Sequence, residues 1–221
     1  MTFSLSRVKL TEPGGVAFGV LDLELFWSLE FGAWSFFPNM PKHRPSKTSS
    51  DLRTQLAKVK LLLCDVDGVL TDGTVLIGGN FEAKRFSILD GFGMRLLQRE
   101  GIKVGWVSNR PSPATEQRAK ELRIDFLEQP TGSKVEAVEA ILHRAGLGWD
   151  EICFVGDDLV DLGVLKRAGF SAVVANGIDE AKAVADYVTQ ASGGAGAVRE
   201  VAVMILKAQN KWKRVVQSFS A

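Results

Sequence analysis

From Val59 onward, short apolar runs alternate with amphipathic stretches, and this alternation restricts the fold of the 221-residue chain more than any other feature. The apolar runs have the length of strands and few polar positions, which is typical of strands covered on both faces. The stretches between them place apolar residues three and four positions apart, as helices do. We therefore expect an α/β fold with a Rossmann-like doubly wound parallel sheet and helices on both faces. The expected strands are 59–67, 103–109, 124–129, 151–157 and 170–176, and the expected helices are 93–101, 112–123, 133–146, 159–169, 179–186 and 197–212.

Residues 74–86 depart from this alternation. Their pattern indicates two short strands around a Gly-Gly-Asn turn, which is a β-hairpin inserted after the first strand. The domain formed by these elements is expected to span 59–210, and 211–221 is expected to be a weakly patterned tail.

The first forty residues differ from the rest in composition. They hold eight of the 19 aromatic residues, and acids interrupt their apolar stretch, so a secretory signal is not indicated. We interpret residues 1–58 as an N-terminal extension and linker. Residues 1–39 are expected to be poorly ordered or to lie before the true start of translation, and the alternative is an aromatic-rich segment that packs on a partner. Met40 is the candidate for that start.

Charge and cysteine content limit the class of protein. The chain has 27 basic and 26 acidic residues, a net charge of +1, which argues against a nucleic-acid partner bound through bulk basicity. No run of about 18 apolar residues is free of charge, so no membrane span is indicated. Cys64 and Cys153 lie inside apolar runs, which favours buried free thiols in a reducing compartment such as the cytoplasm.

Charged side chains gather where the expected strands end. Asp65 and Asp67 lie at the end of the first strand, residues 108–110 at the end of the strand over 103–109, and Asp157 and Asp158 at the end of the strand over 151–157. The carboxyl ends of parallel strands form the edge at which doubly wound sheets bind ligands. Carboxylates that share such an edge repel one another unless a cation lies between them, and oxygen ligands favour a hard ion such as Mg²⁺.

Ser108 and Lys134 add a hydroxyl donor and a positive charge to this edge. Lys134 opens a helix, where a cation opposes the macrodipole, so helix formation does not explain its place. Phosphoryl transfer suits the set, because a divalent ion and a lysine neutralise an anionic ester while one aspartate attacks phosphorus. A second aspartate two residues away can protonate the leaving oxygen, and Gly68 would allow the bend that turns Asp67 toward the substrate.

The segment DVDGVLTDG at 65–73 resembles the first signature of the haloacid dehalogenase superfamily of phosphotransferases. Ser108, Lys134 and GDDLVD at 156–161 match the second, third and fourth signatures in the expected order. With the hairpin and the segments FSILDGFGMRLL, SNR, GSK and YVTQASGGAGAVRE, the chain over about 60–210 resembles the 3-deoxy-D-manno-octulosonate 8-phosphate phosphatase family.

This resemblance implies a capless core and a Mg²⁺-dependent phosphomonoesterase that forms an aspartyl-phosphate. The substrate it implies is a sugar acid phosphate, most simply 3-deoxy-D-manno-octulosonate 8-phosphate from lipopolysaccharide biosynthesis. It also implies a cytoplasmic homotetramer built around the hairpins, in which neighbouring subunits help to close each site.

The resemblance assigns a role to each matching residue. Asp65 is the nucleophile and a metal ligand, Asp67 is the general acid and base with a metal-binding backbone carbonyl, and Asp157 is the third metal ligand. Ser108 and Lys134 bind phosphate, Asp158 and Asp161 orient the metal ligand and its waters, and sugar contacts fall on Ser87, Ile88, Leu89, Asp90, Gly91, Arg95, Arg110 and Arg118.

Two positions depart from the family pattern. Leu89 stands where the family commonly has arginine, and Asn109 stands where it usually has glycine. Both lie where a sugar would be bound, so they leave the reaction class intact and weaken the choice of substrate.

Three alternatives remain open. The first is a phosphatase of the same subgroup acting on a nine-carbon ulosonic acid 9-phosphate. The second is a phospho-accepting signalling module, although such modules phosphorylate an aspartate of a later strand and carry their lysine last. The third is a non-catalytic binding module, against which the intact Asp67 argues.

Overall fold

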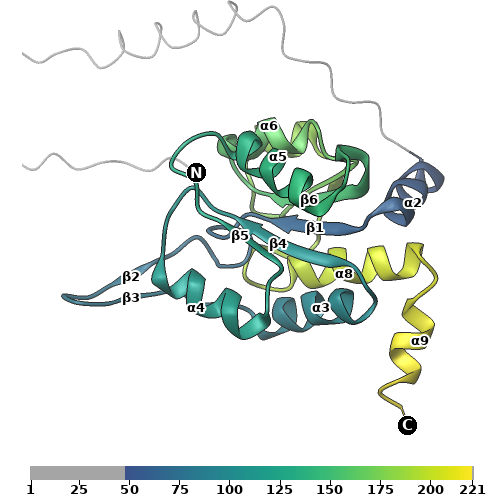
Figure 1. The fold of residues 1–221 in the computed structure, drawn as a ribbon, viewed down its shortest axis with the longest axis horizontal. Helices are drawn as coiled ribbons and strands as arrows, with labels where there is room; N and C mark the ends of the chain where they lie inside the picture. Colours follow the sequence, from purple (N-terminus) through teal and green to yellow (C-terminus); the bar gives the residue numbers. More distant parts are fainter. Residues whose placement is uncertain (1–47, 221) are drawn as a thin grey trace, which may run out of the picture. The chain divides into compact units, whose positions relative to one another are not determined.

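The computed structural model describes residues 48–220, which fold around one parallel six-stranded sheet (Figure 1). The strand order is β5-β4-β1-β6-β7-β8, so β1 lies between the two halves and the chain order reverses beside it. The strands are β1 (Leu61–Cys64), β4 (Lys103–Val107), β5 (Phe126–Glu128), β6 (Ile152–Gly156), β7 (Phe170–Val173) and β8 (Tyr187–Val188). The predicted doubly wound sheet is confirmed, and β8 is a short edge strand that the sequence pattern did not predict.

Helices cover both faces of the sheet (Figure 1). Side chains alternate along β1, so that Leu62 and Cys64 join one core cluster and Leu61 and Leu63 join the other. The first cluster is covered by α3 (Ile88–Arg99), α4 (Pro113–Leu122) and α8 (Ala197–Ala208), and the second by α5 (Lys134–Ala145), α6 (Leu162–Leu165) and α7 (Asp179–Val184).

Local capping decides where the helices begin and end. Ser133 caps α5 by accepting a hydrogen bond from the Glu136 amide, and Gly146 ends that helix with a φ of 66°. Helix α3 begins five residues before the predicted start, because the Ser87 side chain caps it through the Asp90 amide. The predicted helix over 159–169 is instead a 3₁₀ turn, Leu159–Asp161, followed by the short α6.

Both ends of the described chain are more structured than predicted. Residues Ser49–Lys58, which we had placed in a linker, form α2 with a capping box at Thr48, and its Leu56 is buried in the core. Residues Trp212–Gln217, placed in a tail, form α9, whose Val215 is buried. The expectations for residues 1–47 lie outside the described residues.

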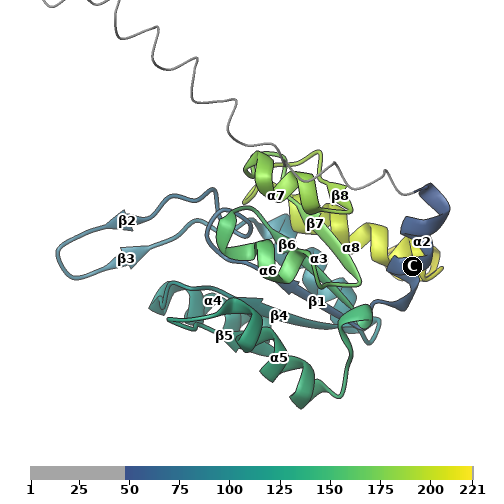
Figure 2. The same cartoon turned by 90° about the horizontal axis from the view of Figure 1, so that it is seen from above.

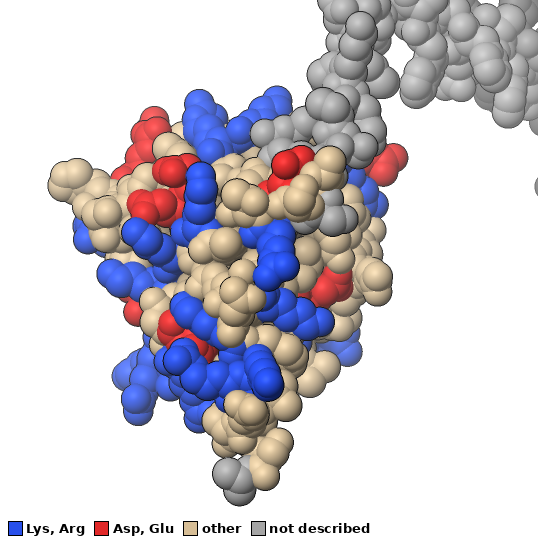
Figure 3. Space-filling model, turned by 90° about the vertical axis from the view of Figure 1, so that its right-hand side faces the viewer, with Lys and Arg blue, Asp and Glu red and all other residues tan. Residues whose placement is uncertain are grey.

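On the face that carries α2, α8 and α9, lysine and arginine outnumber acids (Figure 3).

The predicted hairpin is also present, as the antiparallel pair β2 (Leu76–Ile77) and β3 (Glu82–Ala83). It projects away from the sheet (Figure 2). Three large apolar side chains near its tip are mostly exposed, namely Leu76, Ile77 and Phe81.

The short 3₁₀ turn Trp149–Glu151 precedes β6. No helix within residues 48–220 is long and apolar enough to cross a membrane.

If α2 belongs to the folded domain, Leu56→Ala should lower the free energy of unfolding by about 2–5 kcal/mol, because it opens a cavity against α8. Denaturant unfolding measures this change. The exposed Lys58→Ala on the same helix should change stability by less than about 0.5 kcal/mol. Equal small effects of both substitutions would contradict a structural role for α2.

Candidate active site

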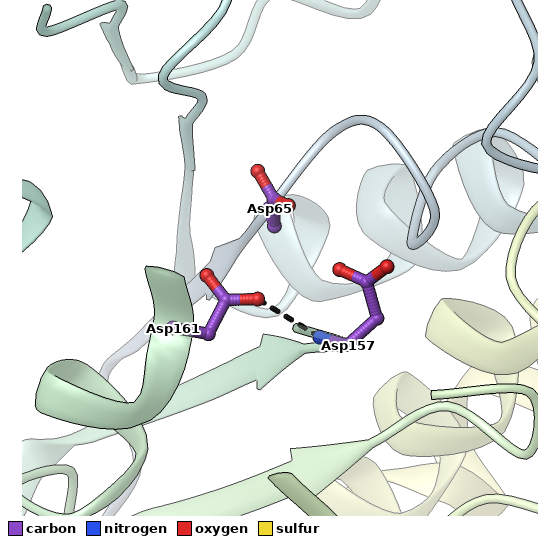
Figure 4. Close-up of side chains that lie close together, drawn as sticks. All are labelled: Asp65, Asp157 and Asp161. Atoms are coloured by element: carbon purple, nitrogen blue, oxygen red, sulfur yellow. Dashed lines mark hydrogen bonds between the residues drawn. The ribbon is translucent and has the colours of Figure 1, made fainter. Parts of the chain in front are cut away.

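The acidic residues predicted for the site meet at the carboxyl edge of the sheet. Asp65 directly follows β1, and its amide donates to the Val155 carbonyl at 2.9 Å, which continues the pairing with β6. Asp157 directly follows β6, and Asp161 ends the 3₁₀ turn after it. Figure 4 shows the carboxylates of Asp65, Asp157 and Asp161 grouped around one space.

One lysine holds two of these acids. The Lys134 ammonium lies 3.0 Å from Asp65 Oδ1 and 2.7 Å from Asp161 Oδ1, and its side chain is only 2% exposed. The other oxygen of Asp161 accepts a hydrogen bond from the Asp157 amide at 2.8 Å (Figure 4). Asp161 therefore joins the lysine to the backbone of the Asp157 loop, which is the contact that an orienting role requires.

The site has the donor set and the room for a divalent cation. Carboxylate oxygens of Asp65, Asp157 and Asp161 lie within 4.8 Å of one another, and Asp157 Oδ1 is buried without a hydrogen-bond partner among the described residues. A Cβ at Gly68 would lie 2.0 Å from Asp157 Oδ2, so any side chain at this position would clash with the Asp157 carboxylate where it now lies. Because both Asp161 oxygens already accept hydrogen bonds, Asp65 and Asp157 are the better candidates for direct ligands.

Burial and mutual repulsion raise the pKa of two of these acids. Burial, together with the Asp161 charge and against the Lys134 charge, raises the pKa of Asp65 to about 6. Burial and then the charges of Asp65, Asp161 and Asp158 raise the pKa of Asp157 to about 8. Burial opposes the charge of Lys134, but the two neighbouring carboxylates outweigh it and leave its pKa raised. The cluster therefore lacks positive charge, which a bound cation would supply.

The candidate acid and base, Asp67, has a partner that the sequence analysis missed. Its oxygens lie 2.8 and 2.9 Å from the Lys84 ammonium, at the end of the hairpin. The Lys84 side chain is fully buried, and its ammonium also donates to Thr115 Oγ1 at 3.1 Å. The bend expected after Val66 is present, since the chain turns over residues 66–70 and Gly68 has a φ of 94°. The Lys84 contact depends on how the hairpin folds back, for which the sequence pattern holds no signal.

Ser108 and Arg110 lie at the same edge of the sheet. Ser108 directly follows β4, and its buried hydroxyl accepts a hydrogen bond from the Arg110 amide at 3.2 Å. The Arg110 guanidinium donates to both carboxylate oxygens of Glu82 on β3, at 3.0 and 2.6 Å. The Arg110 hydrogen bonds, followed by that of the Ser112 hydroxyl, lower the pKa of Glu82 to about 2. In this structure Arg110 is thus held by the hairpin.

Asp90, predicted to touch the sugar, instead caps a helix. Its side chain is buried, and its oxygens accept hydrogen bonds from the amides of Arg199 at 2.7 Å and Gly196 at 3.2 Å, at the start of α8. That helix has glycine at its N-cap, so it needs a side chain from elsewhere to satisfy its first amides. Both Asp90 oxygens are thus engaged at the start of α8, and its role as a sugar contact stays a prediction.

The remaining residues predicted to bind the sugar lie at the N-cap of α3, on α3 itself and on α4. Ser87 caps α3, and Ile88 and Leu89 are mostly exposed beside it. A Cβ at Gly91 would lie 2.8 Å from an Arg118 nitrogen, so these two are packed together, while Arg118 pairs with Glu121 at 2.6 Å. Arg95 donates to Gln98 and to the Leu122 carbonyl at the end of α4.

Asp158, predicted to orient the metal ligand, is exposed. Its carboxylate accepts a hydrogen bond from the Leu159 amide at 2.6 Å and so caps the 3₁₀ turn. It acts on Asp157 through its charge.

Similar proteins are found by sequence and by structure. The sequence model of the haloacid dehalogenase-like hydrolases matches residues 126–201. The chain is 37% identical over 164 residues to the 3-deoxy-D-manno-octulosonate 8-phosphate phosphatase of Escherichia coli K12, which covers 74% of this chain and 87% of that protein. The phosphatase of that name from Moraxella catarrhalis, solved with a magnesium ion, a phosphate ion and a KDO molecule, is 36% identical with a TM-score of 0.76, covering 78% and 99% of the two chains. The Yersinia pestis phosphatase is 36% identical with a TM-score of 0.73, covering 75% and 90%.

Metal affinity should rise with pH. A divalent cation binds ionised carboxylates, and the raised pKa values of about 6 for Asp65 and about 8 for Asp157 mean that protons compete with it. The dissociation constant for Mg²⁺, measured by calorimetric titration, should therefore fall as pH increases from about 6 to about 8. An affinity independent of pH over this range would contradict the assignment of these two ligands.

The same two pKa shifts predict that the metal-free fold loses stability as pH rises. Both pKa values are raised above those of the unfolded chain, so the stability that protonation gives the metal-free fold is present below about pH 4 and is lost as pH rises through about 6 and 8. Mg²⁺ should therefore raise the melting temperature more at pH 8 than at pH 6.

Proposed function

Since the chain belongs to the 3-deoxy-D-manno-octulosonate 8-phosphate phosphatase family of haloacid dehalogenase-like hydrolases, we propose that it is a Mg²⁺-dependent phosphomonoesterase acting on 3-deoxy-D-manno-octulosonate 8-phosphate. One observation carries the proposal. A buried aspartate at the end of the central strand lies 3.0 Å from a buried lysine and within 4.8 Å of two further acids. This arrangement gives an attacking carboxylate fixed positive charge on one side and a cation site on the other.

Asp65 is the nucleophile in this reaction. One of its carboxylate oxygens attacks phosphorus as the bond from phosphorus to the sugar oxygen breaks, which leaves an aspartyl-phosphate on Asp65. Asp67, two residues along, donates a proton to the departing sugar oxygen. Asp67 then takes a proton from the water that attacks phosphorus, which breaks the acyl phosphate and releases inorganic phosphate.

Lys134 and Ser108 hold the phosphoryl group. The Lys134 ammonium already touches Asp65, so it is placed to offset the charge of an incoming phosphate beside a carboxylate. The Ser108 hydroxyl, at the end of the neighbouring strand β4, can donate to a phosphate oxygen. Mg²⁺, held by Asp65 and Asp157, supplies further positive charge at this edge when it is bound.

The substrate is proposed from the relatives, which are 3-deoxy-D-manno-octulosonate 8-phosphate phosphatases. Leu89 and Asn109 differ from the family pattern near that region. Purified protein should therefore be compared on 3-deoxy-D-manno-octulosonate 8-phosphate and on a nine-carbon ulosonic acid 9-phosphate. A higher kcat/KM on the first supports the proposal, and a large preference for the second overturns the choice of substrate.

Assembly and location are part of the same proposal. The exposed Leu76, Ile77 and Phe81 of the hairpin support a homotetramer built around this element, since apolar side chains gathered on a projection favour burial against another copy. The two free cysteines, both buried, support a reducing compartment and hence the cytoplasm.

Asp65→Asn should abolish turnover, because an amide oxygen cannot attack phosphorus as a carboxylate does. Hydrolysis of p-nitrophenyl phosphate, with and without Mg²⁺, measures this loss. Glu139→Gln, on the exposed face of α5, is the matched control and should keep full activity. Full activity of the Asp65→Asn protein would contradict the proposed function.

A further inference from the structure

The hairpin carries a lysine whose side chain is buried beside the proposed acid and base, Asp67. Among the described ion pairs outside the acid cluster, the one between Lys84 and Asp67 has the most deeply buried cation, with the Lys84 side chain 0% exposed. The ammonium contacts both oxygens of Asp67, at 2.8 and 2.9 Å, and the hydroxyl of Thr115 at 3.1 Å. Burying a lysine is costly unless its geometry is well satisfied, and such pairs contribute little to net stability. A role in holding Asp67 accounts for the contact better than stability does.

The neighbouring contacts show that the hairpin is fixed at this edge. Glu82 and Lys84 are two residues apart, so both can reach the same side of the strand. Glu82 binds Arg110 through two hydrogen bonds and accepts another from the Ser112 hydroxyl at 2.5 Å. Ser112 caps α4, the helix that carries Thr115. The Lys84 ammonium is thereby held from two sides, by the hairpin and by α4.

We propose that Lys84 is a positioning residue for Asp67. It fixes the carboxyl group where the protonated acid can give its proton to the leaving oxygen and the resulting carboxylate can take one from water. This inference rests on the proposed function. A general acid must lie within hydrogen-bond distance of the atom it protonates, and a free aspartate side chain samples several rotamers. Contact of one ammonium with both carboxylate oxygens removes that freedom. The anchor comes from the inserted hairpin, outside the four signature segments of the sequence.

The dependence on the leaving group separates this role from a structural one. A sugar oxygen is a poor leaving group that needs a proton, whereas p-nitrophenolate leaves readily without one. Lys84→Met should lower kcat/KM for the sugar acid phosphate by about 10²-fold, the scale of loss for a misplaced catalytic group. The loss on p-nitrophenyl phosphate should be much smaller. Equal losses on the two substrates would overturn the inference.

A double-mutant cycle shows whether Lys84 acts through Asp67. In an Asp67→Asn protein, the further substitution Lys84→Met should cost little on the sugar acid phosphate, because the group it positions is already gone. A further loss as large as in the wild-type background would mean that Lys84 acts on the substrate or the fold directly, and would contradict the proposal. Lys120→Met, exposed on α4, is the matched control and should leave both activities unchanged.

A milder substitution decides the matter if Lys84→Met does not fold. Lys84→Arg keeps the charge but moves it, and it should show the same selective loss on the sugar acid phosphate. Equal losses on both substrates would again overturn the inference. Failure of the proposed function is recognised separately, because the wild-type protein would then hydrolyse neither substrate.

Discussion

The shortage of positive charge around Asp65 is the constraint on which the rest of the site depends. Asp65, Asp157 and Asp161 place carboxylate oxygens within 4.8 Å of one another, yet within residues 48–220 only one buried lysine pairs with this group. The raised pKa values of Asp65 and Asp157 express that imbalance. A divalent cation corrects it, and the corrected site can admit an anionic ester beside a carboxylate nucleophile.

The sheet makes this crowding possible. Strands β1 and β6 are paired in register, so the residues that follow them emerge side by side at the carboxyl edge. Gly68 leaves the room that the Asp157 carboxylate occupies, and Lys134 enters from the first turn of α5. The hairpin adds the outer layer of contacts, through Lys84 to Asp67. The acid cluster is therefore held by the central strands, and the proposed acid and base by an insertion.

The sequence predicts the part of this arrangement that depends on local pattern. Apolar strands, the hairpin turn and the caps of α5 are encoded within a few residues, and acids at strand ends converge because the sheet is parallel. Long-range contacts that do not follow from the order of the strands, such as those of Asp90 and Lys84, were not predicted. Asp90 carries the family's position for a sugar contact, but its burial under the first turn of α8 depends on how α3 and α8 pack. Nothing in the sequence around Lys84 distinguishes it from a surface lysine, because its burial depends on the way the hairpin folds back.

The helices at the two ends of the domain, α2 and α9, were not predicted for the same reason. Helix α2 has weak periodicity, and its place is set by Leu56 packing against α8, which lies about 150 residues later in the chain. Helix α9 follows Asn210, whose φ of 57° ends the preceding turn. Neither feature is visible in a window the length of a helix.

The most direct test of the account is to find where phosphate is attached during turnover. Protein quenched with acid during turnover of the sugar acid phosphate in the presence of Mg²⁺ can be digested and examined by mass spectrometry. We predict one phosphorylated peptide, modified at Asp65 and missing when a chelator removes the metal. Phosphate on a peptide without Asp65, or equal labelling with and without the metal, would contradict the claim that a cation allows this carboxylate to accept a phosphoryl group.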